Sequence, residues 1–317
     1  MKVVPHGSEP LILVYHETQA DRYAQALITA GLERVAVARD VATASAWLDM
    51  TEVMLAWNFP AELYQRMPNL RWVQWMGAGV DAVANRLPER VALTRIVGQF
   101  GKDMAEYVFT WLLHEYHEVD RFLDAKRTRE WKPKRVATLA GKTLGVAGLG
   151  SIGKEVVRIG RAFGMNVIGL SRSGCQRDLV DEHFSPSAWL AFATKVDVLV
   201  VVLPLTQETE GVVDEAVLAA LKQDAILINI GRGRTVDEAA LLSRLQAGAL
   251  RAAVLDVFEE EPLPQNHPFW SLPNVYITPH IAGPSRIRDV SRFFYDNYLR
   301  DLQGLALEGV VDRKRGY

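Results

Sequence analysis

The feature that most constrains this chain is a glycine-rich segment, Val146-Ala147-Gly148-Leu149-Gly150-Ser151-Ile152-Gly153. An apolar run precedes it and a helix-like stretch follows it. With this spacing Gly148 allows a tight turn, Gly150 lets the backbone approach a pyrophosphate, and Gly153 lets the helix pack against the strand. A purely structural turn can carry the same letters, but the strand–turn–helix context favours a dinucleotide site. The expected cofactor contacts, at the positive end of the helix, are Gly148, Gly150, Ser151, Ile152 and Gly153.

The composition is that of a globular protein with two domains. The chain has 317 residues, 49% of them hydrophobic, and a net charge of −2, so neither nucleic acid nor a membrane surface is an expected partner. The single cysteine, Cys175, excludes an internal disulfide and a cysteine-based metal cluster. Residues 1–15 lack a secretory cleavage pattern, and the apolar run 196–205 is too short to span a bilayer. We expect a cytoplasmic protein that needs no metal.

Alternating strands and helices predict two α/β domains. In the first third, apolar runs at 11–15, 53–57 and 71–76 predict strands, with a helix at 20–30. After Gly153 the alternation repeats with continuously apolar strands at 166–170, 197–203, 225–230, 252–255 and 275–278, and one of the intervening helices at 237–247. Such strands form parallel sheets covered by helices on both faces. The later set predicts a Rossmann-type doubly wound sheet, and the earlier set a smaller, flavodoxin-like α/β domain.

The end of the chain is expected to return to the first domain. A helical stretch at 285–307 follows the last strand, and the first domain lacks enough helices to cover its sheet. Two chain crossings would then form a hinge near Gln99 and Pro284. The predicted domains are a substrate-binding domain of residues 1–99 and 285–317 and a dinucleotide-binding domain of residues 100–284.

The residues after the second strand of the Rossmann sheet distinguish the two nicotinamide dinucleotides. A carboxylate there binds the ribose 2′-hydroxyl of NAD, whereas a basic residue accommodates the 2′-phosphate of NADP. Here Ser171, Arg172 and Ser173 follow the strand, and no carboxylate occurs before Asp178. The guanidinium and the two hydroxyls favour NADP(H), with NAD(H) as the alternative. Alternatively, Arg172 is a solvated surface side chain that stacks on the adenine ring.

Three further segments follow strands of the same domain and carry reactive side chains. They are 229–233 with Arg232, 255–264 with Asp256 and Glu261, and 278–283 with His280. Since parallel strands end at one edge of their sheet, these side chains should face the cofactor. An arginine can hold a carboxylate, a histidine can protonate a carbonyl oxygen, and a carboxylate can orient the imidazole. This set suits the reduction of a 2-oxo acid.

Together these motifs resemble the D-isomer-specific 2-hydroxyacid dehydrogenase family over essentially the whole chain. The family pattern is a glycine-rich fingerprint, an Asn-x-x-Arg-Gly turn, an Asp-Val-Phe-x-x-Glu-Pro segment and a final Pro-His-Ile, and all four occur here in that order. Within the family the likeness is greatest to reductases of glyoxylate and hydroxypyruvate. That likeness is carried by Gly77-Ala78-Gly79-Val80-Asp81, Trp131-Lys132-Pro133 and residues 311–317.

The resemblance implies a role for each candidate residue. Arg232 would bind the substrate carboxylate and carbonyl, and His280, paired with Glu261, would be the general acid in reduction. Asp256 would contact the nicotinamide amide, and the backbone N–H groups of Ala78 and Gly79 would bind the substrate carboxylate. Further cofactor contacts are implied for Leu203, Pro204, Thr209, Ile230, Gly231, Arg232 and His280.

Two tryptophans and several histidines allow more than one interpretation. By resemblance Trp57 lines the substrate pocket and Trp131 approaches it from a partner subunit, but packing in a core or interface explains either ring equally well. A long helical pattern at 102–126 is likewise compatible with a core helix or a dimer interface, and a homodimer is expected. The remaining histidines, among them His114, His117 and His183, are expected on the surface or in an interface.

The predicted activity is hydride transfer from NADPH to a short 2-oxo acid, glyoxylate or hydroxypyruvate, to give the D-2-hydroxy acid. Two alternatives stay open: a dinucleotide-sensing, corepressor-like binding protein, and a reductase of longer 2-oxo acids. The segment 97–104 departs from the small, apolar sequence common in the family, so distant relatives do not define the substrate.

Overall fold

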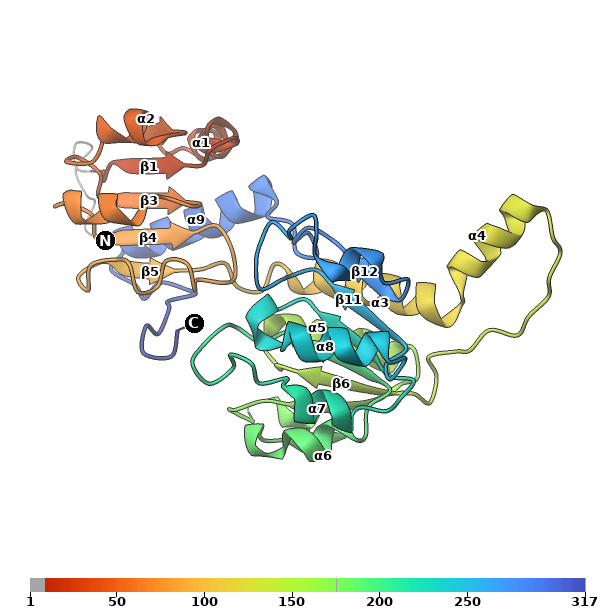
Figure 1. Ribbon diagram of the computed structural model, residues 1–317. Coiled ribbons are helices and arrows are strands. Elements are labelled where there is room, and N and C mark those ends of the chain that lie inside the picture. The colour runs from red at the N-terminus through yellow and green to blue at the C-terminus, as the bar shows by residue number, and fades with distance from the viewer. Residues whose placement is uncertain (1–8, 175, 317) are drawn as a thin grey trace. The chain divides into compact units, whose positions relative to one another are not determined.

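The structure is a computed structural model that describes residues 9–174 and 176–316. Cys175 and the first eight residues, on which part of the composition argument rests, lie outside the described residues. The chain forms two compact units, both visible in Figure 1. Unit 1 consists of residues 1–99 and 285–317, and unit 2 of residues 100–284.

Unit 1 is a parallel α/β sheet. Its described residues form five strands in the order β2-β1-β3-β4-β5. The strands are β1 (Ile12–Tyr15), β2 (Val35–Ala38), β3 (Val53–Ala56), β4 (Trp72–Trp75) and β5 (Ala92–Thr94). Its helices are α1 (Ala20–Thr29), α2 (Val41–Ser45) and α9 (Ile287–Leu302), with a 3-10 turn η1 (Ala61–Arg66). The three predicted strands and the first helix are present. β2 and β5, which no prediction covered, are short and only partly buried.

The last helix of the chain, α9, completes unit 1. It packs against α1, and Phe294 stacks on Trp72 of β4 with ring centroids 5.2 Å apart. Asn297 of α9 donates to the side-chain oxygen of Gln74 at 3.2 Å, and Gln74 in turn accepts from Thr94 at 2.7 Å. These polar groups are buried and satisfy one another, so they stabilise the helix against the sheet without leaving an unpaired donor. The expected return of the C-terminal helix is confirmed.

Unit 2 is a doubly wound Rossmann-type sheet. Its described residues form seven parallel strands in the order β12-β11-β10-β9-β6-β7-β8. They are β6 (Thr143–Ala147), β7 (Asn166–Leu170), β8 (Glu182–Phe184), β9 (Val198–Val201), β10 (Ile226–Asn229), β11 (Ala252–Leu255) and β12 (Val275–Ile277). The order reverses between β6 and β9, which is the point where such sheets bind ligands. The predicted fold class is confirmed, and the polar edge strand β8 is an addition to it.

Helices cover both faces of the unit 2 sheet. α3 (Gly101–Tyr116) packs on α5 (Ser151–Ala162), and α6 (Trp189–Ala193) packs on α7 (Glu215–Ala220), which packs on α8 (Glu238–Gln246). Single 3-10 turns lie at η2 (Arg177–Leu179), η3 (Pro186–Ala188), η4 (Gly233–Thr235) and η5 (Pro268–Ser271). The strands β9 and β10 between these layers are fully buried, which explains why their sequences are continuously apolar.

The long helix predicted at 102–126 is wrong: the structure has two helices. α3 ends at Tyr116, and α4 (Val119–Thr128) begins after Glu118, whose backbone is left-handed with φ of +51°. No residue of α4 is buried, and Figure 1 shows α4 projecting from the rest of unit 2. The apolar spacing continues across the break because both helices are amphipathic, and sequence spacing alone therefore does not reveal the change of direction.

No helix among the described residues combines the length and the apolar character that crossing a membrane requires.

Candidate active site

The glycine-rich turn has the geometry of an anion cradle. β6 ends at Ala147, and α5 begins at Ser151, where no side chain of the described residues caps the first N–H groups. Gly148 has φ of +106°, and a Cβ there would lie 2.7 Å from the carbonyl oxygen of Val202. A Cβ on Gly153 would lie 1.9 Å from the carbonyl oxygen of Gly148. Because uncapped N–H groups at a helix start attract phosphate, these residues fit a dinucleotide.

Gly150 differs from its two neighbouring glycines. A Cβ built on it meets no described atom within 4 Å, and its φ of −72° is accessible to any residue. Neither packing nor backbone conformation of the protein therefore requires glycine at this position. The requirement predicted from the sequence, close approach of a ligand to the backbone, is consistent with the open space in front of Gly150.

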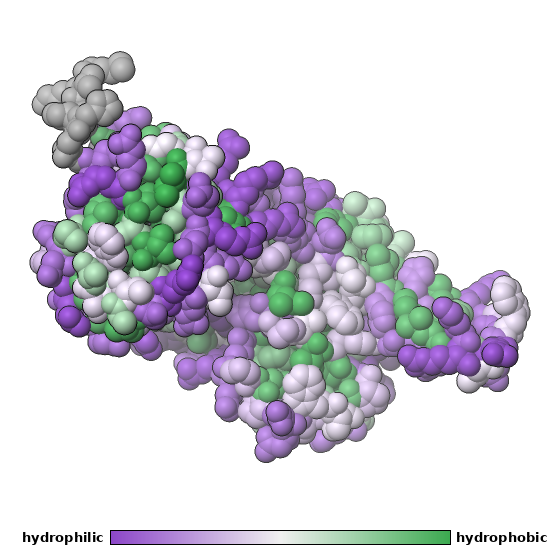
Figure 2. Space-filling view, turned by 90° about the horizontal axis from the view of Figure 1, so that it is seen from above, coloured by the Kyte–Doolittle hydropathy of each residue, from purple (hydrophilic) through white to green (hydrophobic). Residues whose placement is uncertain are grey.

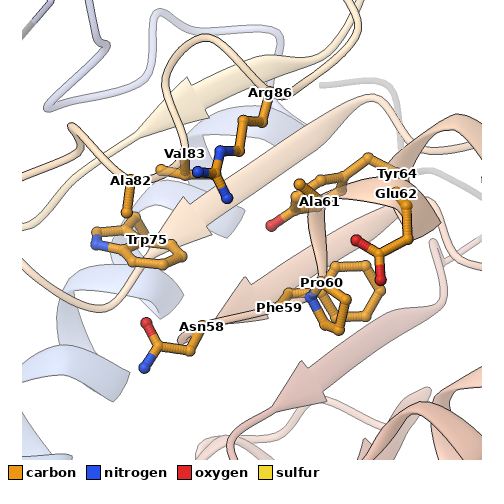
Figure 3. A pocket seen from close by; sticks show the side chains of 10 residues that line it. All are labelled: Asn58, Phe59, Pro60, Ala61, Glu62, Tyr64, Trp75, Ala82, Val83 and Arg86. Atoms are coloured by element: carbon orange, nitrogen blue, oxygen red, sulfur yellow. The ribbon is translucent and has the colours of Figure 1, made fainter.

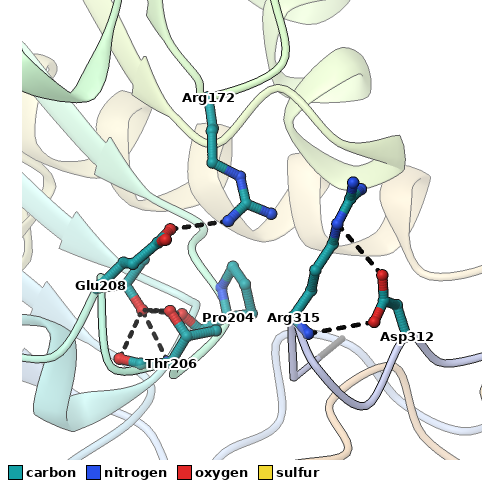
Figure 4. Close-up of polar contacts among 7 residues, drawn as sticks. Arg172, Pro204, Thr206, Glu208, Asp312 and Arg315 are labelled. Carbon is teal, nitrogen blue, oxygen red and sulfur yellow. Dashed lines mark hydrogen bonds and ion pairs between the residues drawn. The ribbon is translucent and has the colours of Figure 1, made fainter.

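The residues after β7, the strand that pairs with β6, form a second polar group. The Arg172 guanidinium donates to Glu208 at 2.7 Å, as Figure 4 shows. Ser171 hydrogen-bonds His183 at 2.9 Å, so this half-buried histidine has a partner inside the unit rather than on the expected surface or interface. The Thr209 hydroxyl accepts from the N–H of Thr206 and donates to the carbonyl of Pro204 at 2.6 Å, and thereby closes the turn after β9.

The turn after β10 presents Arg232. The Asn229 side chain accepts from the N–H of Gly231 at 3.1 Å and donates to the carbonyl of Arg232 at 3.0 Å. Gly233 is tightly confined, since a Cβ there would lie 1.9 Å from the carbonyl carbon of Phe258. The asparagine of the Asn-x-x-Arg-Gly motif therefore shapes the turn. This role of Asn229 was not predicted, although its fixed spacing from Arg232 in the motif was a usable signal.

His280 and Glu261 form a close pair. The imidazole Nδ1 lies 2.8 Å from Glu261 Oε2, and the other carboxylate oxygen accepts from the N–H of Phe258 at 3.0 Å. Burial alone would raise the pKa of Glu261, but the hydrogen bonds from His280 and Phe258 and the positive charge of Arg232 lower it below its ordinary value. Glu261 is therefore a carboxylate at neutral pH, and Arg232 lies near enough to act on it electrostatically.

Asp256 holds the loop that carries His280. Its carboxylate is 1% exposed and accepts hydrogen bonds from Thr278 Oγ1 at 2.6 Å and from the N–H groups of Ile281 and Ala282, each at 2.9 Å. The N–H of His280 itself donates to the carbonyl of Asp256 at 2.9 Å. A buried carboxylate with this many donors is satisfied, so it stabilises one backbone path for the loop.

Three predicted substrate residues lie in unit 1. Trp57 follows β3 and packs on Trp75 with ring centroids 5.0 Å apart, and a Cβ on Gly77 would lie 2.7 Å from the Trp57 ring. Ala78 and Gly79 follow β4 and are half-buried. Within the described residues, no hydrogen bond uses their N–H groups. These two donors are therefore available to a ligand, and their role in binding a carboxylate stays a prediction.

A cavity of about 270 Å³ also lies in unit 1, and sequence analysis missed it. Figure 3 shows Trp75 on one wall and the Tyr64 hydroxyl directed into the space. That hydroxyl has no hydrogen-bond partner among the described residues, and burial raises the pKa of Tyr64 far above its usual value. The lining residues are Asn58, Phe59, Pro60, Ala61, Glu62, Tyr64, Trp75, Ala82, Val83 and Arg86.

Residues 109–282 match the family model described as "D-isomer specific 2-hydroxyacid dehydrogenase, NAD binding domain". The chain belongs to the D-isomer specific 2-hydroxyacid dehydrogenase family. Glyoxylate/hydroxypyruvate reductase A of Serratia proteamaculans is 36% identical over 271 residues, which cover 83% of this chain and 87% of the relative. The same enzyme of Yersinia enterocolitica is 34% identical over 275 residues, with coverage of 83% and 87%.

Solved structures of the family show the same fold. A D-isomer specific 2-hydroxyacid dehydrogenase family protein of Aeromonas salmonicida has a TM-score of 0.89 and 35% identity, covering 96% of this chain and all of that one. The NADPH-dependent glyoxylate/hydroxypyruvate reductase of Sinorhizobium meliloti, in complex with NADP and sulfate, has a TM-score of 0.88 and 32% identity, covering 97% of this chain and all of that one.

These findings confirm the family and the enzyme class that the motifs predicted. The protein is an NAD(P)-dependent dehydrogenase of the 2-hydroxyacid family, and the matched region is the cofactor-binding part of that family. Among the described residues, no group of three or more His, Cys, Asp or Glu side chains could hold a metal ion.

Two glycine substitutions should distinguish a glycine required for stability from one required for cofactor binding. In Gly153→Ala the methyl group would collide with the Gly148 carbonyl, so we expect the free energy of unfolding to fall by about 1–3 kcal/mol. In the control, Gly150→Ala, the methyl group points into open space, so unfolding should be unchanged while the Kd for NADPH rises roughly tenfold. Chemical denaturation and fluorescence titration measure the two effects. Equal loss of stability in both variants would contradict this assignment of the glycines.

Proposed function

We propose that this dehydrogenase uses NADPH to reduce a short 2-oxo acid, glyoxylate or hydroxypyruvate, to the D-2-hydroxy acid. The observation that carries the proposal is the His280–Glu261 pair at 2.8 Å, with the Arg232 charge beside it. The names of the relatives support the choice of substrate, and the S. meliloti complex supports the choice of cofactor. Unit 2 would bind the dinucleotide. Unit 1 would bind substrate through Trp57, Ala78 and Gly79.

The proposed chemistry assigns one task to each side chain. The bound cofactor supplies a hydride to the carbonyl carbon. His280, protonated on both ring nitrogens, donates its Nδ1 proton in a hydrogen bond to Glu261 and transfers its Nε2 proton to the carbonyl oxygen. Glu261 orients the ring through this hydrogen bond. The Arg232 guanidinium binds the carboxylate and the carbonyl oxygen, where negative charge develops. The products are the hydroxy acid and NADP⁺.

Arg172 is proposed to select NADPH. Its guanidinium extends from the end of β7, and one of its partners, Glu208, is a solvent-exposed carboxylate with 68% exposure. An exposed ion pair contributes little free energy, so exchange of Glu208 for a ribose 2′-phosphate with two or more charge-assisted hydrogen bonds is favourable. Ser171 and Ser173 would add hydroxyl donors to the same phosphate.

A homodimer is proposed from the projecting helix α4. None of its residues is buried, and its apolar side chains Phe122 and Leu123 are 40% and 45% exposed. Trp131, just after α4, is 93% exposed. Figure 2 shows hydrophobic surface on this projecting segment. A helix of ten residues is marginal in water on its own, so we propose that a second copy of the chain covers it.

Removal of the proposed acid should greatly reduce turnover. In His280→Ala we expect kcat with glyoxylate to fall about 10²–10⁴-fold, the usual contribution of a general acid, while the Kd for NADPH changes little. His117→Ala, at an exposed histidine, is the control.

In Arg232→Ala kcat/KM for glyoxylate should fall comparably, whereas Arg234→Ala, whose side chain pairs with Glu210, should stay near wild type. Steady-state assays of NADPH oxidation measure both pairs, and near-normal turnover in His280→Ala would refute the proposed role.

Loss of the Arg172 guanidinium should change cofactor preference. Because hydrogen bonds to a charged group contribute about 1.5–3 kcal/mol, we expect Arg172→Ala to raise the KM for NADPH roughly 10- to 100-fold and to leave the KM for NADH nearly unchanged. Arg177→Ala, an exposed arginine five residues further on, is the matched control. An equal rise in both KM values would exclude phosphate recognition by Arg172.

A charge placed on the apolar side of α4 should dissociate the proposed dimer. We expect Phe122→Asp to sediment as a monomer at micromolar concentration, because burial of an unpaired carboxylate in an interface is costly. Thr128→Asp adds the same charge at an exposed polar position of α4 and should remain a dimer. A monomeric wild-type chain would overturn the proposal.

A further inference from the structure

One face of α3 lies against β12 and the residue that follows it. Tyr107, Trp111 and Glu115 are spaced four residues apart on α3 and therefore share one side of the helix. Tyr276 and Thr278, two residues apart, share one side of the strand. The two sides meet: the Trp111 ring packs on Tyr276 with centroids 4.8 Å apart, and the Tyr107 hydroxyl lies 2.6 Å from Thr278 Oγ1.

The hydroxyl of Tyr107 begins a short chain of hydrogen bonds. Thr278 Oγ1 donates to Asp256 Oδ1 at 2.6 Å, and a hydroxyl has only one proton to donate. Tyr107 must then be the donor to Thr278. Burial raises the pKa of Tyr107 well above its usual value, which keeps the proton on the phenol. The chain therefore runs Tyr107 O–H to Thr278 O–H to the Asp256 carboxylate.

The end of this chain holds a strained loop. His280 has φ of +53°, in the left-handed region that side chains with a Cβ rarely adopt. Such a conformation is unfavourable and persists only where the surroundings enforce it. Here the enforcing contacts are the Asp256 hydrogen bonds to Ile281 and Ala282, on the C-terminal side of the histidine, and to Thr278, on its N-terminal side.

We propose that Tyr107 is a positioning residue that, through Thr278 and Asp256, keeps His280 in the orientation needed for proton transfer. The proposal rests on the function proposed above for His280. Tyr107 touches neither Glu261 nor His280 in any described hydrogen bond, so its effect must pass through the loop. Each hydrogen bond in such a series polarises the next. Loss of the Tyr107 hydrogen bond therefore weakens the hydrogen bonds between Asp256 and the loop.

The test removes one oxygen atom. In Tyr107→Phe we expect kcat for glyoxylate to fall about threefold to tenfold, because a misdirected acid slows proton transfer. The KM for glyoxylate and the Kd for NADPH should change less than twofold, since Arg232 and the glycine-rich turn are untouched and Asp256 keeps its hydrogen bonds from Ile281 and Ala282. Tyr276→Phe is the matched control. It removes a hydroxyl from the same contact between α3 and β12, where the partners are Glu115 and Asp120 rather than Thr278, and kcat should stay within about twofold of wild type.

Variants of Thr278 separate positioning from general packing. Thr278→Val removes the hydroxyl at nearly constant volume and should lower kcat about tenfold, whereas Thr278→Ser keeps the hydroxyl and should restore kcat to near wild type. If Tyr107 acts through its hydrogen bond to Thr278, Tyr107→Phe has no further effect on kcat in the Thr278→Val background. Thermal unfolding of every variant reports whether it is folded.

Two outcomes would overturn the inference. The first is a kcat for Tyr107→Phe equal to that of Tyr276→Phe. The second is an effect of Tyr107→Phe that is the same in the wild-type and Thr278→Val backgrounds. If His280→Ala stays active, the proposed function itself fails; if His280→Ala is inactive and either outcome occurs, this inference alone is wrong.

Discussion

The candidate site in unit 2 depends most on the buried carboxylate of Asp256. It accepts hydrogen bonds from Thr278, Ile281 and Ala282 and so joins the end of β11 to the loop after β12. An isolated charge with 1% exposure would be strongly destabilising, but several donors make this one favourable only in a single loop conformation. Because the buried carboxylate is destabilising without hydrogen-bond donors, it restrains the loop, and with it His280, to the conformation that supplies them.

The rest of the candidate site follows from the edge at which parallel strands end. Arg232 follows β10, Asp256 and Glu261 follow β11, and His280 follows β12, and these three strands are neighbours in the sheet. Each turn has its own internal support: Asn229 for the arginine turn, and the Phe258 N–H for Glu261. Rigid elements hold the reactive groups, and short loops aim them, which is how a site achieves the preorganisation that catalysis requires.

Several predictions came directly from the sequence because their physical causes are local. Glycine spacing at 148, 150 and 153 reflects contacts within one turn, and continuously apolar runs reflect strands covered on both faces. The break between α3 and α4 was missed because the apolar spacing continues through it. It depends on the left-handed backbone of Glu118. The partner of His183 was also missed, since Ser171 reaches it across the neighbouring strands β7 and β8.

By itself, the sequence determined which reactive groups this protein has and the strand after which each one lies, because motif spacing and strand pattern are properties of short segments. Only the tertiary structure decided how those groups are held. The donors around Asp256 and the contact of Tyr107 with Thr278 join residues that lie far apart in the chain, the last pair 171 positions apart. The contacts of Asp256 enforce the left-handed backbone of His280. Hydrogen-bond partners of that kind are chosen by packing of helix on sheet, and no local pattern encodes them.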